Sequence, residues 1–308
     1  MVDFSKLKGA NNLGKLQKTL EDQAKGSFER DSTEWMCTLD KAGNGSATFR
    51  FLPGAFVDGE DALPWVHLFR HAFQGPGGWY IENSLATLKQ KDPCQEMSGK
   101  FWTQGNKKQA RLQKRKLTYI SNIYMINDPG NPDNDGKVFK YRYGVKIFNK
   151  IRYRMGYDEE GNLMENRDLT DPDEAIFDPF DLFTGANFKL KVKKIETDGQ
   201  KFPSYEDSRF MAPSALLGGD EEKLEAIWRS EYSLAAIVAP DQFKSYEDLS
   251  KRLQQVLSRA GDSLPKRAET AKVTPKEPES KTDDETLPWV DSEQDENPMD
   301  YFKKLAEG

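Results

Sequence analysis

Hydrophobic and polar residues alternate with a period of two along much of the first half of the chain, which predicts β-strands. In residues 116–126, one face carries Leu117, Tyr119, Ser121, Ile123 and Met125. Similar runs cover residues 47–52, 65–73, 79–81 and 138–143. A later run, residues 188–193, has Lys at every second position and predicts a half-buried strand with a basic outer face.

A helical period appears in four other stretches: residues 14–25, 144–153, 219–230 and 241–260. Beyond Gly261, prolines and charged residues follow no period, which predicts a disordered acidic tail. We therefore expect an α+β protein in three parts. These are an N-terminal arm (residues 1–25), a core (residues 26–260), and a linker with an acidic tail (residues 261–308).

Composition narrows the class of protein. The chain has 308 residues, of which 36% are hydrophobic. No apolar run reaches the roughly 18 residues that would span a bilayer, and the N-terminus lacks the apolar centre of a signal peptide. Two cysteines, Cys37 and Cys94, are too few for a disulfide framework. These features predict a soluble intracellular protein with no membrane partner.

Charge is distributed very unevenly along the chain. Residues 100–154 contain fourteen Lys and Arg against three Asp, a net charge of +11. Residues 276–308 contain eleven acids against four Lys, a net charge of −7. This asymmetry predicts a polyanionic partner for the basic block and a tail that competes for the same surface.

Cations and aromatic rings are interleaved within the basic block. Lys114, Arg115 and Lys116 lead into a strand that carries Tyr119. The same mixture recurs in Lys137, Lys140, Tyr141, Arg142, Tyr143 and Lys146. Single-stranded nucleic acid is bound by cations that follow the phosphates and by rings that stack on unpaired bases. The alternative for any one of these rings is a place in the core, with the neighbouring lysines forming a solvated face.

Motifs of catalysis are missing from the sequence. There is no phosphate-binding G-x-x-x-x-G-K-[ST] loop and no G-x-S-x-G elbow. Paired acids such as Asp158-Glu159 and Asp220-Glu221 fall in turns or at helix starts, where acids are common. We therefore expect a binding protein and not an enzyme.

The acidic tail contains a short apolar motif. Its residues are Met299, Tyr301, Phe302 and Leu305, of which three are spaced by three positions. An amphipathic element within an acidic tail is typical of a docking peptide for partner proteins. The alternative is a solubilising tail in which these apolar residues are incidental.

Five segments point to a known family. They are RFLP (residues 50–53), WYIE (79–82), KRKLTYISNIYMINDPGNPDNDGKVFKYRYGVKIFNKI (114–151), GANFKLKVKKI (185–195) and FPSYEDSRF (202–210). With them, residues 34–258 resemble the helix-destabilising, single-stranded-DNA-binding proteins of T-even-type phages, the gene 32 product family. The resemblance implies an oligonucleotide-binding-type (OB-like) β-barrel with a small adjoining subdomain and peripheral helices. It also implies DNA contacts at Arg50, Trp79, Lys114, Arg115, Lys116, Tyr119, Tyr141, Arg142, Phe202 and Tyr205.

The sequence departs from the family at its zinc site. Family members have one His and three Cys, with twelve, nine and two residues between successive ligands; His71, Ser84, Cys94 and Met97 keep this spacing here. Ser and Met are poor zinc ligands. We therefore expect no bound zinc and no other cofactor, and a subdomain held together by packing alone, around Phe69, Phe73, Trp79 and Ile81.

A second departure lies in the N-terminal arm. Family members carry a Lys- and Arg-rich Ser/Thr motif there, which drives cooperative self-association. This arm offers Lys6, Lys8, Lys15 and Lys18, interrupted by Asp3 and Gly9. By resemblance we expect self-association along DNA, with residues 114–118 as the surface that receives the arm.

These features together predict a protein that binds single-stranded DNA with little sequence preference. It would coat and protect DNA in the host cytoplasm during phage replication, recombination and repair, and recruit replication and recombination proteins through its tail. The alternative is an RNA-binding or replisome scaffold protein that uses the same cationic, aromatic groove. Stacking tolerates either sugar, and no residue of the sequence is identified as a reader of the 2′-hydroxyl.

Overall fold

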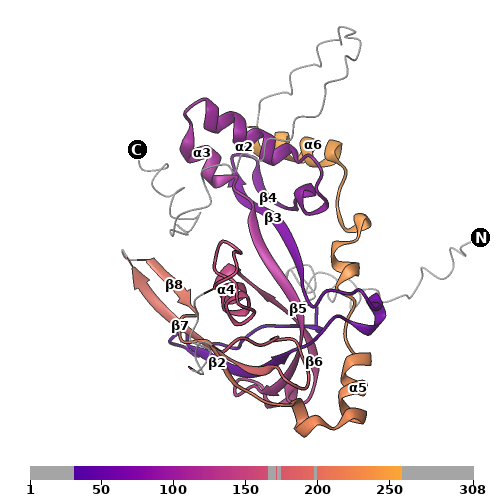
Figure 1. Ribbon diagram of the computed structural model, residues 1–308. Helices are drawn as coiled ribbons and strands as arrows, with labels where there is room; N and C mark the ends of the chain where they lie inside the picture. The colour runs from indigo at the N-terminus through magenta and orange to yellow at the C-terminus, as the bar shows by residue number, and fades with distance from the viewer. Residues whose placement is uncertain (1–30, 166–170, 172–174, 198–199, 259–308) are drawn as a thin grey trace, which may run out of the picture.

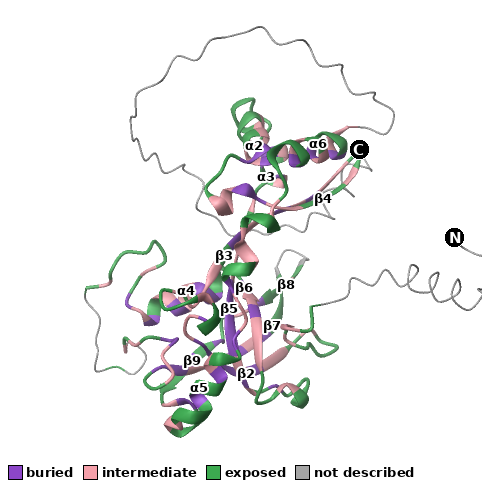
Figure 2. Cartoon of the chain, turned by 90° about the vertical axis from the view of Figure 1, so that its right-hand side faces the viewer, coloured by how far each residue is buried: buried purple, intermediate pink, exposed green. Residues whose placement is uncertain are grey.

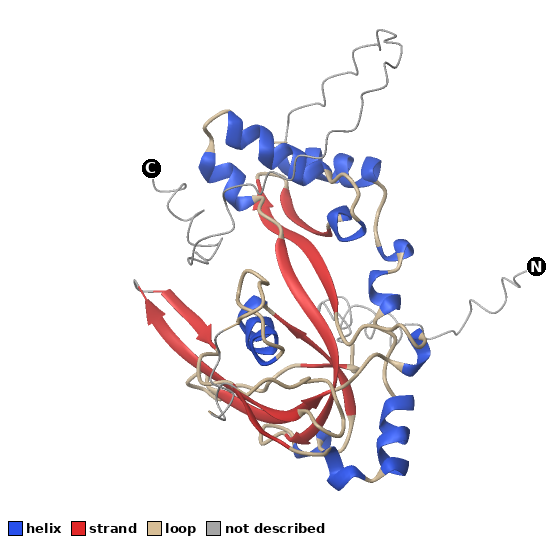
Figure 3. Ribbon diagram, viewed as in Figure 1, coloured by secondary structure: helices blue, strands red, loops and turns tan. Residues whose placement is uncertain are grey.

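A computed structural model of the chain describes residues 31–165, 171, 175–197 and 200–258 (Figure 1). The strands are β1 (Glu34–Trp35), β2 (Gly45–Phe51), β3 (Val66–Gly75), β4 (Gly78–Asn83), β5 (Lys116–Asn127), β6 (Val138–Tyr143), β7 (Ala186–Thr197), β8 (Gln200–Ser204) and β9 (Arg209–Pro213). The α-helices are α2 (Pro93–Thr103), α3 (Lys107–Leu112), α4 (Val145–Arg154), α5 (Glu221–Arg229) and α6 (Tyr246–Leu257). Figure 3 shows one strongly curved sheet with α2, α3, α5 and α6 at its periphery, whereas α4 lies between β5 and the arm formed by β7 and β8.

Strand β5 connects two regions of the molecule. Its first half, residues 116–120, pairs with β3, and its second half, residues 123–127, pairs with β2. The opposite edge of β5 pairs with β6 through residues 119–124. The sheet therefore divides at about Tyr119 into a body, built on β2, β5, β6, β7 and β9, and a subdomain, built on β3, β4, α2, α3 and α6.

The body is organised by an aromatic core. Figure 2 shows buried residues along β2 and β5. Among the largest fully buried side chains of the body are Phe49 and Phe51 of β2 and Phe188 of β7. Their ring centroids lie 5.3–5.6 Å apart. The period-two pattern of β5 explains the arrangement, since Tyr119, Ile123 and Met125 all face this core. Rings of this size bury a large apolar area, which stabilises the body.

The subdomain has a much smaller apolar core, to which the end of the described chain contributes. Phe73 and Tyr80 from the β3–β4 hairpin pack with Cys94 of α2 and with Leu253 and Val256 of α6. The approach of α6 to the hairpin is very close: a Cβ on Gly77 would lie 1.9 Å from the carbonyl oxygen of Gln255. Glycine is therefore required at this turn.

Most strands and helices that the hydrophobic pattern predicts are confirmed. The mixed α+β class is also confirmed, but the strand pairs of the described residues follow an open path and do not close into a barrel. The last helix begins at Tyr246 instead of Asp241, because the Ser245 hydroxyl caps it by accepting a hydrogen bond from the backbone N–H of Asp248 (3.1 Å). The pattern did not predict β1, β8, β9, α2 or α3.

Three sequence predictions concern residues that the structure does not describe. The helix predicted over residues 14–25, the N-terminal arm and the tail motif at residues 299–305 lie outside the described residues. Of the described helices, none has the length and apolar character needed to cross a membrane.

Candidate nucleic-acid interface

A stack of aromatic rings begins at the point where the body meets the subdomain. Strand β6 ends at Tyr143, which pairs with Tyr119, and Gly144 then caps α4. The helix folds back so that the rings of Phe148 and Tyr119 lie face to face, with centroids 3.8 Å apart and planes inclined by 10°. On the same face, the Tyr119 and Tyr143 centroids are 5.9 Å apart. Tyr119 is half-buried, so part of its side chain remains accessible.

The next two rings of the stack are fully enclosed. Tyr143 and Tyr141 are only 4% and 5% exposed, and the ring of Tyr141 is surrounded by Trp35, Phe49 and Phe51. Burial raises the pKa of both phenols, and the Tyr143 hydroxyl forms a hydrogen bond with Ser121 (2.9 Å). Tyr141 and Tyr143 are therefore core residues and not DNA contacts, since no base can reach their rings in this structure.

Arg50 is also an internal residue, contrary to its expected place on the DNA surface. Its side chain is fully buried, and its guanidinium donates hydrogen bonds to Asn187 Oδ1 (3.0 Å) and to the carbonyl oxygens of Asp181 (3.0 Å) and Ser214 (2.6 Å). Burial lowers the pKa of Arg50 to about 10, an effect opposed by Asp181, so the group stays charged near neutral pH. In this position it joins β2 to β7, to the loop before β7 and to the residue that follows β9.

The cations of the basic block separate into free and paired groups. Lys114, Lys116, Lys137 and Lys146 are exposed and form no ion pair within the described part of the chain. Lys140 and Arg142 lie on the opposite face of β6 from the rings, where Lys140 pairs with Asp31 (2.6 Å) and Arg142 with Glu34 (2.9 Å).

Arg115 is held by its neighbours in the subdomain. Its guanidinium lies 4.2 Å from the Phe69 ring centroid and donates a hydrogen bond to Gln95 Oε1 (2.8 Å). Burial lowers the pKa of Arg115, and Asp92 opposes this shift. The exposed Lys114 and Lys116 on either side are therefore presented by a fixed backbone.

The remaining predicted aromatic contacts lie on three separate elements. Trp79 in β4 is 41% exposed, and its carbonyl oxygen accepts a hydrogen bond from Arg252 of α6 (2.7 Å). Phe202 in β8 and Tyr205 just after it are half-buried, and Tyr205 packs against the body core. Helix α4 connects the two sides, since Phe148 contacts β5 while Lys150 Nζ donates a hydrogen bond to the carbonyl oxygen of Glu206 (3.0 Å).

Several residues of this surface were not predicted. Phe148 supports the Tyr119 ring, and its apolar position in the helical pattern was the available signal. Trp102, Lys107, Lys108 and Arg111 lie on α2 and α3, which the pattern did not predict because Gly105 interrupts a short polar stretch.

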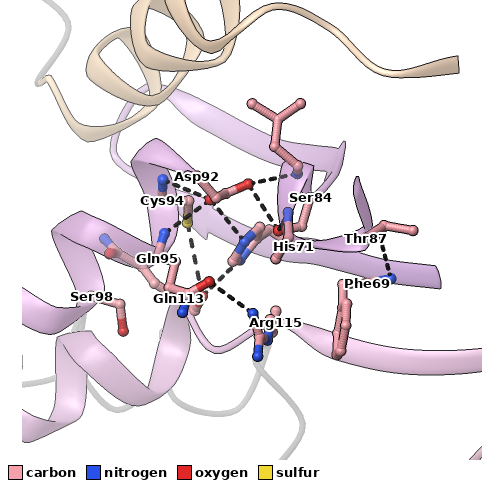
Figure 4. A network of polar contacts seen from close by, with 12 residues as sticks. Phe69, His71, Ser84, Thr87, Asp92, Cys94, Gln95, Ser98, Gln113 and Arg115 are labelled. Atoms are coloured by element: carbon pink, nitrogen blue, oxygen red, sulfur yellow. Dashed lines mark hydrogen bonds and ion pairs between the residues drawn. The ribbon is translucent and has the colours of Figure 1, made fainter. Parts of the chain in front are cut away.

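Three of the four zinc positions, His71, Ser84 and Cys94, lie around the carboxylate of Asp92 (Figure 4). Asp92 Oδ2 accepts hydrogen bonds from Ser84 Oγ (2.8 Å) and the Leu85 N–H (3.0 Å), and Oδ1 accepts from the N–H groups of Cys94 (2.9 Å) and Gln95 (3.0 Å). His71 Nε2 lies 3.2 Å from Asp92 Oδ1. Burial alone would raise the pKa of Asp92, but the facing His71 ring and the hydrogen bonds from Gln95 and Ser84 outweigh it and lower the pKa to about 2.

This donor set does not fit a structural zinc. Ser84 presents a hydroxyl that is used by Asp92, and Met97 presents a thioether packed into the apolar core. Burial raises the pKa of the Cys94 thiol well above its ordinary value, with Asp92 adding to the effect, whereas zinc binds the thiolate. The expectation that packing alone holds the subdomain is wrong, because a buried polar network centred on Asp92 joins β3, the turn after β4 and α2.

A stacked ring at the surface of a mixed sheet, on a strand that begins with exposed, unpaired lysines, is characteristic of the nucleic-acid-binding class of proteins. Comparison with known proteins agrees. Residues 43–257 match the family described as "gp32 DNA binding protein like". The chain belongs to this family.

Named relatives cover most of the chain. It is 37% identical over 241 residues to the single-stranded DNA-binding protein of Enterobacteria phage T2, covering 77% of this chain and 74% of the relative. It is 36% identical over 240 residues to that of Enterobacteria phage T4, with the same coverage of both chains. A shorter match, 38% over 99 residues, is to the single-stranded DNA-binding protein of Enterobacteria phage RB70, covering 31% of this chain and 82% of the relative.

Proposed function

We propose that this protein binds single-stranded DNA with little sequence preference and coats it during phage DNA replication, recombination and repair. The observation that carries the proposal is the half-buried Tyr119 ring, stacked on Phe148 and preceded on the same strand by the exposed Lys114 and Lys116. A ring held rigidly at the surface offers a platform to any base, since every base has a π-face. The lysines attract the phosphates without reading sequence.

The proposed contacts differ in their roles. Tyr119, Trp79, Phe202 and Tyr205 supply ring surface, and Lys114, Lys116, Lys137 and Lys146 supply free charge. Arg115 positions the strand that carries the lysines. Arg50, Tyr141 and Tyr143 act from the interior, and the paired Lys140 and Arg142 join β6 to the segment that contains Asp31 and Glu34. The curved sheet would serve as an OB-type scaffold, with residues 26–260 as the binding core.

We propose further roles for the two ends of the chain, which the structure does not describe. Residues 1–25 would mediate cooperative self-association along DNA, and residues 261–308 would recruit replication and recombination proteins through Met299, Tyr301, Phe302 and Leu305. The protein would work by binding and not by catalysis, in the host cytoplasm. The family membership and the net charge of −7 over residues 276–308 support this arrangement.

A titration of oligo(dT) at several salt concentrations tests the function. If four lysines each neutralise a phosphate, the plot of log affinity against log salt should have a slope of about −3, at about 0.7 per phosphate. The double variant Lys114→Gln, Lys116→Gln should reduce the slope by about 1.4. Lys41→Gln, which changes an exposed lysine in the turn before β2, is the control and should leave the slope unchanged. A slope near zero, equal affinity for duplex DNA, or preference for the matching RNA would contradict the proposal.

A further inference from the structure

We propose that the corner formed by α2 and α3 is a second strand-binding surface, which extends the DNA site beyond Lys114. The surface comprises Lys100, Trp102, Lys107, Lys108 and Arg111, and we call it the α2–α3 corner. Its ligand would be single-stranded nucleic acid that continues from the Tyr119 site. The inference rests on the proposed function and adds the part of the molecule that takes a longer strand.

The corner has a fixed shape. Helix α2 ends at Thr103, and Gly105, with a φ of +79°, turns the chain into α3. The Asn106 side chain caps α3 by accepting a hydrogen bond from the Gln109 N–H (3.3 Å). The two helices are joined because Ser98 Oγ donates a hydrogen bond to the carbonyl oxygen of Ala110 (2.9 Å). Side chains on this corner therefore start from a rigid backbone.

The charge on the corner is uncompensated. Residues 99–127 contain seven Lys and Arg and no Asp or Glu. Lys100, Lys107, Lys108 and Arg111 are all exposed, and within the described residues none of them forms an ion pair. Four unpaired cations on two short α-helices joined by a tight turn repel one another, and a bound polyanion relieves this repulsion.

An exposed tryptophan lies among these cations. Trp102 is 43% exposed, and Lys107 Nζ lies 5.6 Å from the centroid of its ring. A purely electrostatic site for an acidic peptide would have no need of an exposed indole. A ring beside cations instead matches single-stranded nucleic acid, where bases stack and phosphates pair in the same short stretch.

The corner is continuous with the Tyr119 site. Helix α3 ends at Leu112, and Gln113, whose carbonyl oxygen faces His71 Nδ1 (2.9 Å), fixes the connection to Lys114. At a rise of about 1.5 Å per helical residue and about 3.3 Å per strand residue, the helical part of the cationic track, from Lys107 to Leu112, and its strand part, from Lys116 to Tyr119, together measure roughly 17 Å along the chain. Residues 113–115 connect the two parts. Figure 1 shows α3 directly beyond the end of the long β3–β5 ladder. Because residues 99–127 contain no Asp or Glu, the segment that joins the two surfaces interposes no acidic residue.

Binding of oligo(dT) of two lengths to the full chain tests this inference. Lengths of about 5 and about 16 nucleotides lie near the two ends of the site sizes known for OB folds. We expect Trp102→Ala to weaken binding of the longer oligomer about fivefold and to leave the shorter unaffected. Trp102→Phe, which keeps a ring, should retain most of the affinity. The triple variant K107Q, K108Q and R111Q should reduce the salt slope for the longer oligomer by about 2.

Controls separate this inference from the function itself. The triple variant K41Q, K223Q and K251Q removes the same charge from exposed lysines elsewhere and should bind both oligomers as the unmodified protein does. Circular dichroism and thermal unfolding should be unchanged for all variants, since the altered side chains are exposed.

The outcomes that overturn the inference are distinct. If the corner variants bind the longer oligomer normally while K114Q with K116Q loses affinity, the corner is no strand-binding surface and the proposed function stands. If the triple corner variant gains affinity in the full chain, the corner holds an acidic protein segment instead. If the unmodified protein binds neither oligomer, the proposed function itself fails.

Discussion

The body and the subdomain are held together by different physical means. In the body, Phe49, Phe51, Phe188 and Phe210 pack ring against ring, with centroids 4.8–6.2 Å apart. The subdomain has few apolar residues, and a buried carboxylate, Asp92, organises its centre through four hydrogen bonds. A small unit that cannot bury enough apolar surface needs another organiser, and here a side chain acts where a metal would otherwise do so.

The two regions also contrast in how a buried carboxylate is treated. Asp92 in the subdomain is surrounded by donors, whereas Glu231, which follows α5 on the body, is only 6% exposed and has no hydrogen-bond partner for either oxygen within the described residues. Burial, together with Asp58, raises the pKa of Glu231 to about 8. One carboxylate therefore stabilises its region when ionised, and the other destabilises it.

The largest effect should come from removing the carboxylate of the subdomain. Asp92→Ala leaves Ser84, two backbone N–H groups of α2 and His71 without their buried partner, and should lower the free energy of unfolding by about 3–5 kcal/mol. Asp220→Ala is a matched control, because Asp220 also caps a helix by accepting from the Lys223 N–H but is half-exposed. The control should lose only about 1 kcal/mol. Urea denaturation of both variants measures the difference, and equal losses would show that Asp92 is no more than a helix cap.

The second effect concerns pH and Glu231. The folded state favours the protonated carboxyl. The contribution of Glu231 to the free energy of unfolding is therefore fully present below its ordinary pKa of 4.5 and is lost as the pH rises through about 8. Between pH 5 and pH 8.5 the free energy of unfolding should fall by roughly 2–4 kcal/mol. Glu231→Gln should abolish most of this fall and be the more stable protein at pH 8.5. Glu225→Gln, on the exposed face of α5, should behave as the unmodified protein. A pH profile unaffected by Glu231→Gln would contradict the assignment.

The third prediction compares the two regions in DNA binding. Tyr119→Ala in the body and Trp79→Ala in the subdomain should each weaken binding of oligo(dT) by about 1–3 kcal/mol. Tyr119→Phe keeps the ring on Phe148 and should bind nearly normally. Fluorescence titration provides the affinities. If Trp79→Ala has no effect while Tyr119→Ala does, the subdomain hairpin takes no base.

The smallest effect is expected from metal removal. Because Asp92 organises the subdomain, a chelator should change neither the unfolding midpoint nor DNA affinity, and elemental analysis should find no stoichiometric zinc. About one zinc per chain, lost in Cys94→Ala, would show that thiol and imidazole still bind a metal.

The strands of the body could be predicted because their pattern is strong, as in β5, where alternate residues enter one core. Helices α2 and α3 could not, since their stability comes from Asp92 and Asn106 caps and from Ser98, each a single polar contact without a period. The role of Asp92 was hidden for the same reason.

The site shows a similar division. Tyr119, Tyr141 and Tyr143 share one chemical pattern, and only the packing of Trp35, Phe49 and Phe51 against Tyr141 and Tyr143 decides that two of the three are interior. Arg50 has the same explanation, because its three acceptors come from residues 181, 187 and 214, far along the chain. Long-range packing determines which member of a local pattern meets solvent.

The seating of α6 on the β3–β4 hairpin has a consequence for the order of folding. The hydrogen bond from Arg252 to the Trp79 carbonyl joins residues 173 positions apart, and Leu253 and Val256 complete a core begun by Phe73 and Tyr80. Contacts this distant in sequence form slowly, because the intervening chain must first be brought together. During synthesis from the N-terminus, the body strands can pair while the hairpin still lacks its covering helix. The subdomain, although most of it is made early, is therefore completed only when the chain has been synthesised past residue 257.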